Sequence, residues 1–429
     1  MKVRLVSTGG VSLCALLAMV ADEAPARDLV DVIPGLYGGG ATAGIDLVPI
    51  VPPPQIDPTQ SQSHQPHFTG ASLAQLQQLN DSFRQEIRPV PIAPAAGGPT
   101  FEFDAASGRY RETTKTLGPI VAERPETLGR GKFSLGLSYT GFKYDEFEGD
   151  NLDDFQLPLF HQFDVIPPPD TPQAFEEDVV TLTLDVDLRY DVLGFAGVYG
   201  LNDQVDLSVF LPIVRADLEV RSMATTSGDF DNVHGFDCTA PGLRLPAGTT
   251  VEDCLATTDD PNARASESKT GIGDLILGAK YHFYDQEDTD LAVLGRLKLE
   301  TGDDDNFLGT GDTTFSPFLV GRTRLHETPT LATNLHFNAG VELHSDNSDD
   351  LNRADWVVGV DLGSSQWTAA FDVIGRNNFD GDLDTYDFAA GARWRLPGGM
   401  ILTGNLITPL NDDGLRSDLI ATVGIEYRN

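Results

Sequence analysis

Charged residues occur at every second position of one long apolar stretch, a spacing that suits a water-filled path better than bond-making chemistry. Asp185, Asp187 and Arg189 alternate with apolar residues between Val180 and Tyr190. Successive side chains of an extended strand point to opposite faces, so these three charges would share one face. On later segments the same lumen-facing polar row is predicted to include Arg296, Lys298, Arg322, Arg324, His336, Arg393 and Arg395.

The charges of this predicted polar face allow two interpretations. Basic residues concentrate around Arg296 and Arg322, whereas Asp185 and Asp187 lie far from them in the chain. Separated rows of opposite charge would set a transverse field across a lumen and orient polar solutes. Alternatively, ion pairs between strands fill a narrow barrel. The sequence leaves both interpretations open.

Two other patterns have to be weighed as signs of metal binding and of hydrolysis. His336, His344 and Ser345 would serve a hydrolase only if a serine and a histidine were oriented together by a third polar group. Adjacency in sequence does not supply that geometry, so we expect no catalytic residues, no enzymatic activity and no cofactor. An acidic group could ligate calcium, or it could form a solvated rim that attracts divalent cations diffusely. Its members are Asp380, Asp382, Asp384 and Asp387.

The beginning of the chain predicts export. Residues 1–26 have the form of a secretory signal peptide, in which Lys2 and Arg4 precede a short apolar run and a small-x-small cleavage site. Of the three cysteines in the chain, removal of this segment would leave Cys238 and Cys254. In an oxidising compartment we predict a disulfide between them, worth roughly 3 kcal/mol for a loop of this length.

Composition excludes two classes of protein. The 429 residues include 65 Asp and Glu against 29 Lys and Arg, a formal net charge of -36. Binding to nucleic acid needs clustered Lys and Arg for the phosphates, so nucleic acid is excluded as a partner. Beyond the N-terminus no apolar run approaches the roughly 20 residues that a spanning helix requires, so a bundle of transmembrane helices is excluded as well.

Period-two alternation of apolar and polar residues dominates the chain from residue 132 onward. It predicts an all-β fold, a transmembrane antiparallel up-and-down β-barrel of about twelve strands over residues 132–429. The apolar residues of each strand, including Val180 to Tyr190, are expected to meet lipid. The expected strands cover 132–145, 179–199, 205–221, 270–284, 290–301, 313–325, 331–344, 354–363, 366–377, 386–396, 400–410 and 418–428.

The predicted connections alternate between short and long, which favours a bacterial outer-membrane barrel. Such barrels have short turns on the periplasmic side and long loops outside, whereas a soluble sandwich has no reason to separate its loops in this way. An even number of strands places both ends of the barrel domain in the periplasm. The expected partners are therefore outer-membrane lipid and lipopolysaccharide, small-molecule solutes, and divalent cations at the acidic loops.

The region before the predicted barrel divides in two. Residues 27–99 are expected to be a periplasmic linker rich in proline and glycine, of which the part up to about residue 70 builds no core and the later helix rests on the barrel or lies in its lumen. Within it, apolar residues at helical spacing predict one short amphipathic helix at about 72–88. Residues 100–131 are expected to form an entrance segment that could plug the barrel.

The entrance segment and several later motifs resemble a known family. The segment from Leu117 to Gly136 has the sequence LGPIVAERPETLGRGKFSLG, and further matches lie at Gly149–Asp153, Gly271–Asp274 and Thr301–Gly311. Over about residues 117–429 the chain is similar to the outer-membrane barrels of the meta-pathway phenol-degradation family. The resemblance implies a barrel of the transporter or porin class, sometimes associated with the catabolism of aromatic compounds. It implies no catalytic residues.

These observations favour an outer-membrane channel or transporter for passive or facilitated uptake of small solutes, with aromatic or hydrophobic compounds among the candidates. An alternative is a non-conducting surface or structural barrel whose acidic extracellular loops are the working part and whose lumen is plugged. An outer-membrane hydrolase is the least favoured of the three alternatives, because no catalytic residues are expected.

Overall fold

The computed structural model describes fourteen stretches of the chain, and the statements below concern these residues. They are 27–36, 47–49, 79–80, 83, 101–104, 109–112, 115–160, 179–227, 234–236, 257–258, 264–286, 288–345, 352–379 and 384–429. The predicted signal peptide and both cysteines of the predicted disulfide lie outside them. Of the predicted helix at 72–88, only Leu79, Asn80 and Phe83 are described, and their backbone is helical.

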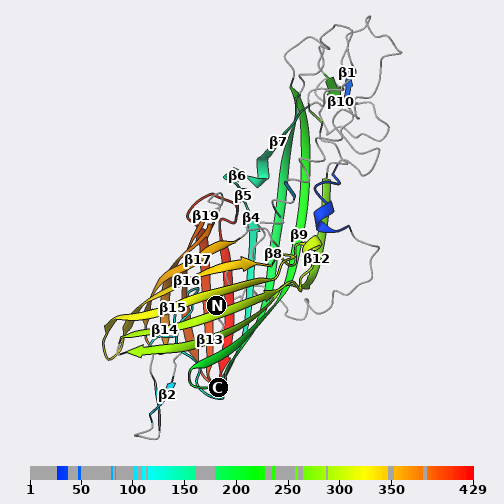
Figure 1. Ribbon diagram of the computed structural model, residues 1–429. Coiled ribbons are helices and arrows are strands. Elements are labelled where there is room, and N and C mark those ends of the chain that lie inside the picture. Colours follow the sequence, from blue (N-terminus) through cyan, green and yellow to red (C-terminus); the bar gives the residue numbers. More distant parts are fainter. Residues whose placement is uncertain are drawn as a thin grey trace, which may run out of the picture.

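The main body is a closed antiparallel β-barrel of twelve strands, which confirms the predicted fold (Figure 1). Each strand pairs with the next, and β22 pairs with β4 to close the ring. β12 and β13 both pair with β9 and act as one interrupted strand. The wall consists of β4 (Phe133–Tyr144), β8 (Val179–Gly200), β9 (Val205–Ser227), β12 (Arg264–Ile272) with β13 (Leu275–Gln286), β14 (Thr289–Leu299), β15 (Thr314–Glu327), β16 (Ala332–His344), β17 (Arg353–Gly363), β18 (Trp367–Asn378), β19 (Asp384–Leu396), β20 (Met400–Pro409) and β22 (Ile420–Arg428).

Small elements accompany the wall. Three 3-10 turns, η1 (Leu29–Asp31), η3 (Leu152–Asp154) and η4 (Asp304–Asn306), are described. No helix in the described part of the chain is long and apolar enough to cross a membrane. The short strands are β1 (Leu47–Pro49) paired with β10 (His234–Phe236), β2 (Phe101–Asp104) with β3 (Arg109–Glu112), β5 (Glu146–Phe147) with β6 (Asp150–Asn151) and β21 (Leu415–Arg416), β7 (Phe155–Phe160) with β8, and β11 (Thr257–Thr258) with β9.

Short connections gather at one end of the barrel, which we call the turn end, and the opposite end is called the loop end. The turn end holds the connections 201–204, 287–288, 328–331, 364–366 and 397–399, together with the end of β22. Gly398 and Gly399 have φ angles of 81° and 80°, a conformation that glycine adopts without strain and that permits the tight turn between β19 and β20. At the loop end β8 and β9 rise well beyond the other strands (Figure 1).

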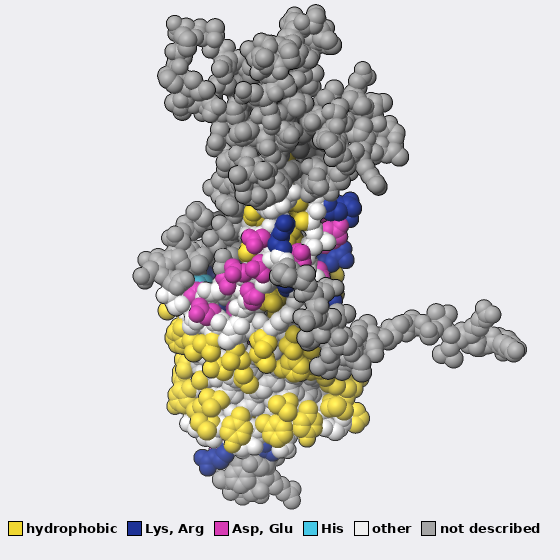
Figure 2. Space-filling model, turned by 90° about the vertical axis from the view of Figure 1, so that its right-hand side faces the viewer, with side chains coloured by type: hydrophobic (Ala, Val, Ile, Leu, Met, Phe, Trp, Pro, Cys, Tyr) yellow, Lys and Arg dark blue, Asp and Glu magenta, His cyan; other side chains and the backbone are white. Residues whose placement is uncertain are grey.

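Exposed apolar side chains form a belt on the outside of the wall, and Figure 2 shows one face of it. The strands alternate between outward apolar and inward polar side chains, because one face of each strand must meet the surroundings and the other the interior. Acidic and basic side chains lie beyond the belt on its loop-end side. The belt includes Leu135, Tyr139, Phe195, Tyr199, Leu207, Val209, Leu277, Tyr281, Val293, Leu297, Phe315, Leu319, Val358, Leu362, Trp367, Phe371, Trp394, Leu402, Leu406, Val423 and Ile425, all at least 36% exposed.

The extension of β8 and β9 beyond the barrel corrects one prediction. The apolar row from Leu182 to Tyr190, expected to meet lipid, is buried instead. β8 has 22 residues and β9 has 23, about twice the roughly 9–11 that a tilted strand needs to cross a membrane. Above the barrel the inward faces of both strands therefore have no lumen to line. They pack into a hydrophobic core with Phe307 and Leu308, which follow η4, and with residues from the N-terminal region.

Residues of the N-terminal region complete this core, although the stretch from 27 to about 70 was expected to build none. Leu29, Ile33 and Phe83 are fully buried at the loop end. The Leu29 amide donates to Asn306 Oδ1 over 3.2 Å, and the rings of Phe83 and Phe147 meet edge to face at 5.1 Å. The prediction was wrong because apolar residues of this region pack against the apolar faces of β8 and β9 that protrude from the barrel.

A charge placed in the belt should destabilise the protein strongly. Phe371, 50% exposed near the middle of β18, is replaced in Phe371→Arg. We expect a loss of about 2–4 kcal/mol in the free energy of unfolding from lipid vesicles, because a cation on the lipid face loses its water. The control is Thr183→Arg, on the outward face of β8 beyond the belt. Equal stability of the two variants would contradict the position of the belt.

Candidate functional site: the lumen and its segment

Residues 115–131, which we call the lumen segment, run inside the barrel. The segment enters at the turn end, where the Leu117 amide donates to Thr368 Oγ1 over 2.7 Å. It reaches the middle of the barrel at Glu123, whose amide donates to Asn338 Oδ1 over 2.6 Å. It returns to the turn end at Leu128. The wall residues that it touches belong to β8, β9, β13, β14, β15, β16, β18, β19 and β22, and a single segment can reach all of them only from within.

The irregular backbone of the lumen segment is satisfied by side chains of the wall. The Val121 amide donates to Asp372 Oδ2 over 2.9 Å, and the Leu128 amide donates to Asp206 Oδ2 over 3.0 Å. In the other direction Arg393 Nε donates to the Pro119 carbonyl over 3.0 Å, and Lys280 Nζ to the Arg124 carbonyl over 2.9 Å. Buried backbone groups require such partners, so the polar wall fixes the path of the segment.

Ion pairs fasten the lumen segment to one side of the wall. Arg296 Nη2 lies 2.8 Å from Glu123 Oε1, and Arg322 Nε lies 2.8 Å from Glu126 Oε1. Arg322 is only 7% exposed and also pairs with Asp290 on β14. Because Arg322 of β15 pairs with carboxylates of both the segment and β14, it connects the segment to these two strands.

A second polar cluster lies beside the first, on β16 and β17, where His336 is the cross-strand partner of Arg322. His336 is 1% exposed, and its Nε2 lies 2.6 Å from Asp361 Oδ2. Asn334 donates to Asp361 Oδ1 over 2.8 Å and to Thr116 Oγ1 over 3.2 Å. Asp361 therefore holds two neighbouring side chains, one of which contacts the lumen segment.

A third cluster closes the inward face toward the loop end. Glu342 Oε1 lies 2.9 Å from Arg353 Nη2 and 3.3 Å from His344 Nε2. Lys298 is buried near them. Asp312, in the loop before β15, also contacts His344 and accepts from Ser345 Oγ over 2.6 Å. Burial works to raise the pKa of Asp312, but hydrogen bonds from Ser345 and His344 outweigh it and hold that pKa below its usual range.

Three of the predicted lumen residues lie on the outer face instead. The register of β8 is continuous, so the odd-numbered Asp185, Asp187 and Arg189 share a face with Phe195 and Tyr199 of the belt. Arg189 Nη2 lies 2.5 Å from Asp187 Oδ2, with 63% of the arginine side chain exposed. The row of acidic residues that would have faced the basic wall across the lumen is therefore absent from β8.

The other predicted lumen residues divide between the interior and the turn end. Arg296, Lys298, Arg322, His336 and Arg393 lie on the inward face, four of them at most 7% exposed. Arg324 pairs with Asp288 at 3.2 Å near a turn. Arg395 lies at the turn end, beside a cavity described below. On the inward face Arg296 and Arg322 pair with carboxylates of the lumen segment, and Arg393 Nη1 lies 3.7 Å from Glu426 Oε2 of β22.

The two described members of the acidic group proposed for calcium, Asp384 and Asp387, have different partners. Asp387 lies on the inward face of β19, 2.6 Å from Arg416 Nη2 and 3.3 Å from Arg376 Nη1. The Asp384 carboxylate accepts from the Tyr386 hydroxyl over 3.5 Å. Asp380 and Asp382 lie outside the described residues. Among the residues that the structure does describe, no group of three His, Cys, Asp or Glu side chains could hold a metal.

The geometry around Ser345 does not favour hydrolysis. The Ser345 hydroxyl donates to Asp312, which also contacts the His344 ring. The carboxylate therefore lies between the serine and the histidine, whereas a hydrolase needs the histidine next to the nucleophile.

Several residues that hold the lumen segment were not singled out as site residues from the sequence. Asp206, Asp290, Asp361 and Glu126 are polar residues at inward positions of strands or of the segment itself. The alternation of the three strand aspartates with their neighbours was a usable signal for facing inward, whereas Glu126 lies in the irregular segment and carried no such signal. Their partners were not predictable, because the contacts join positions as far apart as Glu126 and Arg322.

Removing the shared arginine should be costly. In Arg322→Met two buried carboxylates, Asp290 and Glu126, lose their countercharge. We expect the free energy of unfolding to fall by about 3–5 kcal/mol, measured by denaturant unfolding in detergent micelles. Adding Asp290→Asn and Glu126→Gln to this variant should restore much of the loss, because no unpaired charge then remains. A triple variant no more stable than Arg322→Met would contradict the network.

Comparison with known proteins identifies the family. Solved structures with similar topology include an outer membrane channel from Pseudomonas putida F1 (16% identity, 71% of this chain and 98% of that chain, TM-score 0.39). Others are the KdgM porin (9% identity, 58% and 96%, TM-score 0.32) and the Ralstonia pickettii toluene transporter TbuX (12% identity, 74% and 95%, TM-score 0.31). At identities and TM-scores this low, the similarities carry no argument about the function of this chain or the solutes that it binds.

No curated protein matches the sequence. Residues 170–413, more than half of the chain, match the model of a family described as "Putative MetA-pathway of phenol degradation". The matched region extends from just before β8 to beyond β20, and thus covers most of the wall. The chain belongs to this family.

Proposed function

We propose that the protein is a channel or facilitated transporter in the bacterial outer membrane, through which small solutes move down their own gradient. The observation that supports this most is a closed wall with an apolar outside and a polar inside. A closed barrel satisfies every backbone hydrogen bond within the lipid, so it can cross a membrane without an open edge. A polar interior admits water and solutes that the surrounding lipid would exclude.

The belt supports membrane insertion in a defined orientation. Short turns face the periplasm in such barrels, so the turn end lies in the periplasm and the loop end outside. The belt contacts outer-membrane lipid, and the acidic side chains beyond it lie at the level of lipopolysaccharide. Divalent cations would collect there by diffuse attraction, because the formal net charge is -36.

Whether solutes can pass through the barrel depends on the lumen segment. Ile120 and Ala122 are fully buried, so the segment occupies space in the turn-end part of the lumen. It is held there by hydrogen bonds and ion pairs. We propose that the lumen segment acts as a plug and is part of an entrance region over residues 100–131. Solutes pass either when this plug is displaced or through the gaps that it leaves.

The solute class follows from the family. Its description refers to phenol degradation, which makes small aromatic compounds the first solutes to test. No enzymatic step is proposed, because the Ser345 hydroxyl is bound to Asp312.

The buried plug also favours a second candidate, a non-conducting barrel with its acidic loops as the working surface. Planar-bilayer recordings separate the two. The double variant Asp206→Ala and Asp372→Ala removes the wall carboxylates that accept from the Leu128 and Val121 amides. We expect its conductance to rise at least about threefold over the parent, because the plug is released. The control, Asp187→Ala on the outer face, should leave conductance unchanged. Absence of current in every variant would favour the non-conducting barrel.

A further inference from the structure

The chain that leads to the lumen segment is fixed at both ends of the barrel. Phe83 is fully buried at the loop end, where its ring meets that of Phe147. Lys115 lies at the turn end, where its Nζ is 2.5 Å from Glu327 Oε1 and donates to the Thr328 carbonyl over 3.2 Å. In Figure 1 η1 lies beside the protruding parts of β9 and β12, whereas β2 lies beyond the turn end. Between Phe83 and Lys115 the chain therefore passes from one end of the barrel to the other.

The docking of η1 at the loop end is specific. The Asp28 carboxylate, just before η1, accepts from Asn306 Nδ2 over 3.1 Å and lies 3.4 Å from Lys269 Nζ of β12. Leu29 and Ile33 are fully buried in the core that they form with β8 and β9. Because polar contacts and apolar packing hold the same turn, this part of the chain is an integral component of the loop end.

The passage from the loop end to the turn end needs a route. The wall itself is closed, because each strand pairs with the next and β22 pairs with β4. A path along the outside would place the connecting residues in lipid, and these residues include Arg84, Glu86 and Arg88. Charged side chains and irregular backbone are both costly in hydrocarbon. The lumen is the route that remains.

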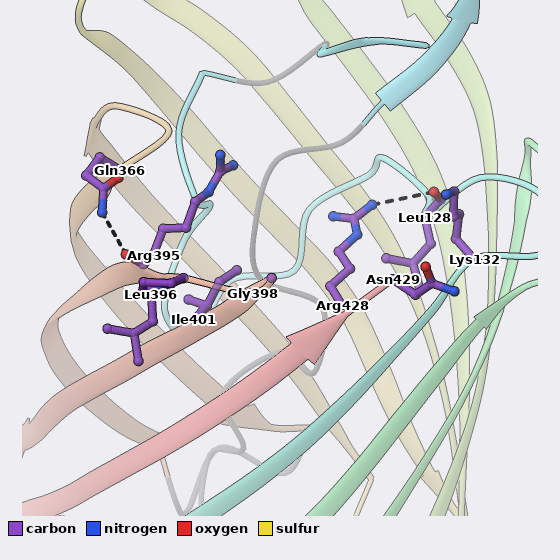
Figure 3. A pocket seen from close by; sticks show the side chains of 11 residues that line it. Leu128, Lys132, Gln366, Arg395, Leu396, Gly398, Ile401, Arg428 and Asn429 are labelled. Carbon is purple, nitrogen blue, oxygen red and sulfur yellow. Dashed lines mark hydrogen bonds between the residues drawn. The ribbon is translucent and has the colours of Figure 1, made fainter. Parts of the chain in front are cut away.

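Length and space both permit this route. Residues 84–100 can span about 55 Å when extended, whereas the hydrocarbon core of a membrane is roughly 30 Å thick. A cavity of about 700 Å³ remains at the turn end between the lumen segment and the wall (Figure 3). It is lined by Leu128 of the lumen segment, by the turn between β19 and β20, and by Arg428 at the end of β22. The lumen segment therefore does not fill the interior at this end.

We propose that the chain passes through the lumen of its own barrel, so that the region up to Phe83 is displayed on the cell surface. The proposal rests on the membrane orientation of the proposed function, in which the loop end faces outward. The barrel then closes around the crossing chain during assembly, because an intact wall has no opening through which a docked segment could enter later. The crossing chain shares the lumen with the lumen segment and narrows the path left for solutes.

Labelling of single cysteines in whole cells by a bulky, membrane-impermeant maleimide tests this proposal. The full chain is used, with its native cysteines replaced. Asp31→Cys, at an exposed position of η1, should react in intact cells to the same extent as after permeabilisation. Lys115→Cys should react only after permeabilisation, because the turn end faces the periplasm. Ile33→Cys, which is close to Asp31 in sequence but fully buried, should stay unreactive in the folded protein under both conditions.

Two further positions report the orientation independently. Arg189→Cys on the outer face of β8 should react in intact cells, and Thr330→Cys in the turn between β15 and β16 only after permeabilisation. With both controls as expected, the proposal is overturned if Asp31→Cys needs permeabilisation or if Lys115→Cys reacts in intact cells.

Two other results also count against the proposal. Equal reaction of Asp31→Cys and Ile33→Cys would contradict the docking of the N-terminal turn. Reversed reaction of the two control positions would overturn the orientation and the surface display together. Since labelling does not depend on current, conductance recorded on the same variants separates this inference from the transport function. Labelling as expected without current in any variant would support the surface display and overturn transport alone.

Discussion

The structure depends on one constraint, which is that a sheet surrounded by lipid must have no open edge. The backbone groups of an unpaired strand would face hydrocarbon without partners, at a cost of several kcal/mol for each group. Pairing of β22 with β4 removes the last edge. Closure also separates two environments, so every wall strand must place apolar side chains on one face and polar side chains on the other. The belt and the charged interior are two consequences of the same closure.

Charges enclosed by such a wall then need partners of their own. An unpaired charge in a narrow interior is strongly destabilising, and pairs must be well hydrogen-bonded to offset the loss of water. The lumen segment answers this need, because Glu123 and Glu126 bring carboxylates to Arg296 and Arg322. The wall in turn supplies the carboxylates and amides that the irregular backbone of the segment requires. Neither the wall charges nor the segment would be stable in this form without the other.

The sequence predicted the wall well and the site only in part. Alternation places two side-chain rows on opposite faces of each strand, and in β4, β16, β18, β19 and β22 the apolar row faces outward as expected. In β8 the same alternation gave the wrong face, because it cannot tell lipid from a core above the membrane. The row from Leu182 to Tyr190 packs in one core with Phe307, Leu308 and N-terminal residues, whose approach is not encoded locally. Contacts such as Glu123 with Arg296 join distant positions and needed the closed barrel to become visible.

The measurement that tests this account most directly is quenching by brominated lipids of a fluorophore attached along β20. Single cysteines are placed at successive positions in a cysteine-free background and reconstituted in vesicles. Leu402 and Leu406 are 43% and 50% exposed, whereas Ile401, Asn405 and Ile407 are at most 4% exposed. The account predicts strong quenching at 402 and 406 and little at 401, 405 and 407. Uniform quenching along the strand, or the opposite alternation, would contradict a wall that separates lipid from a polar interior.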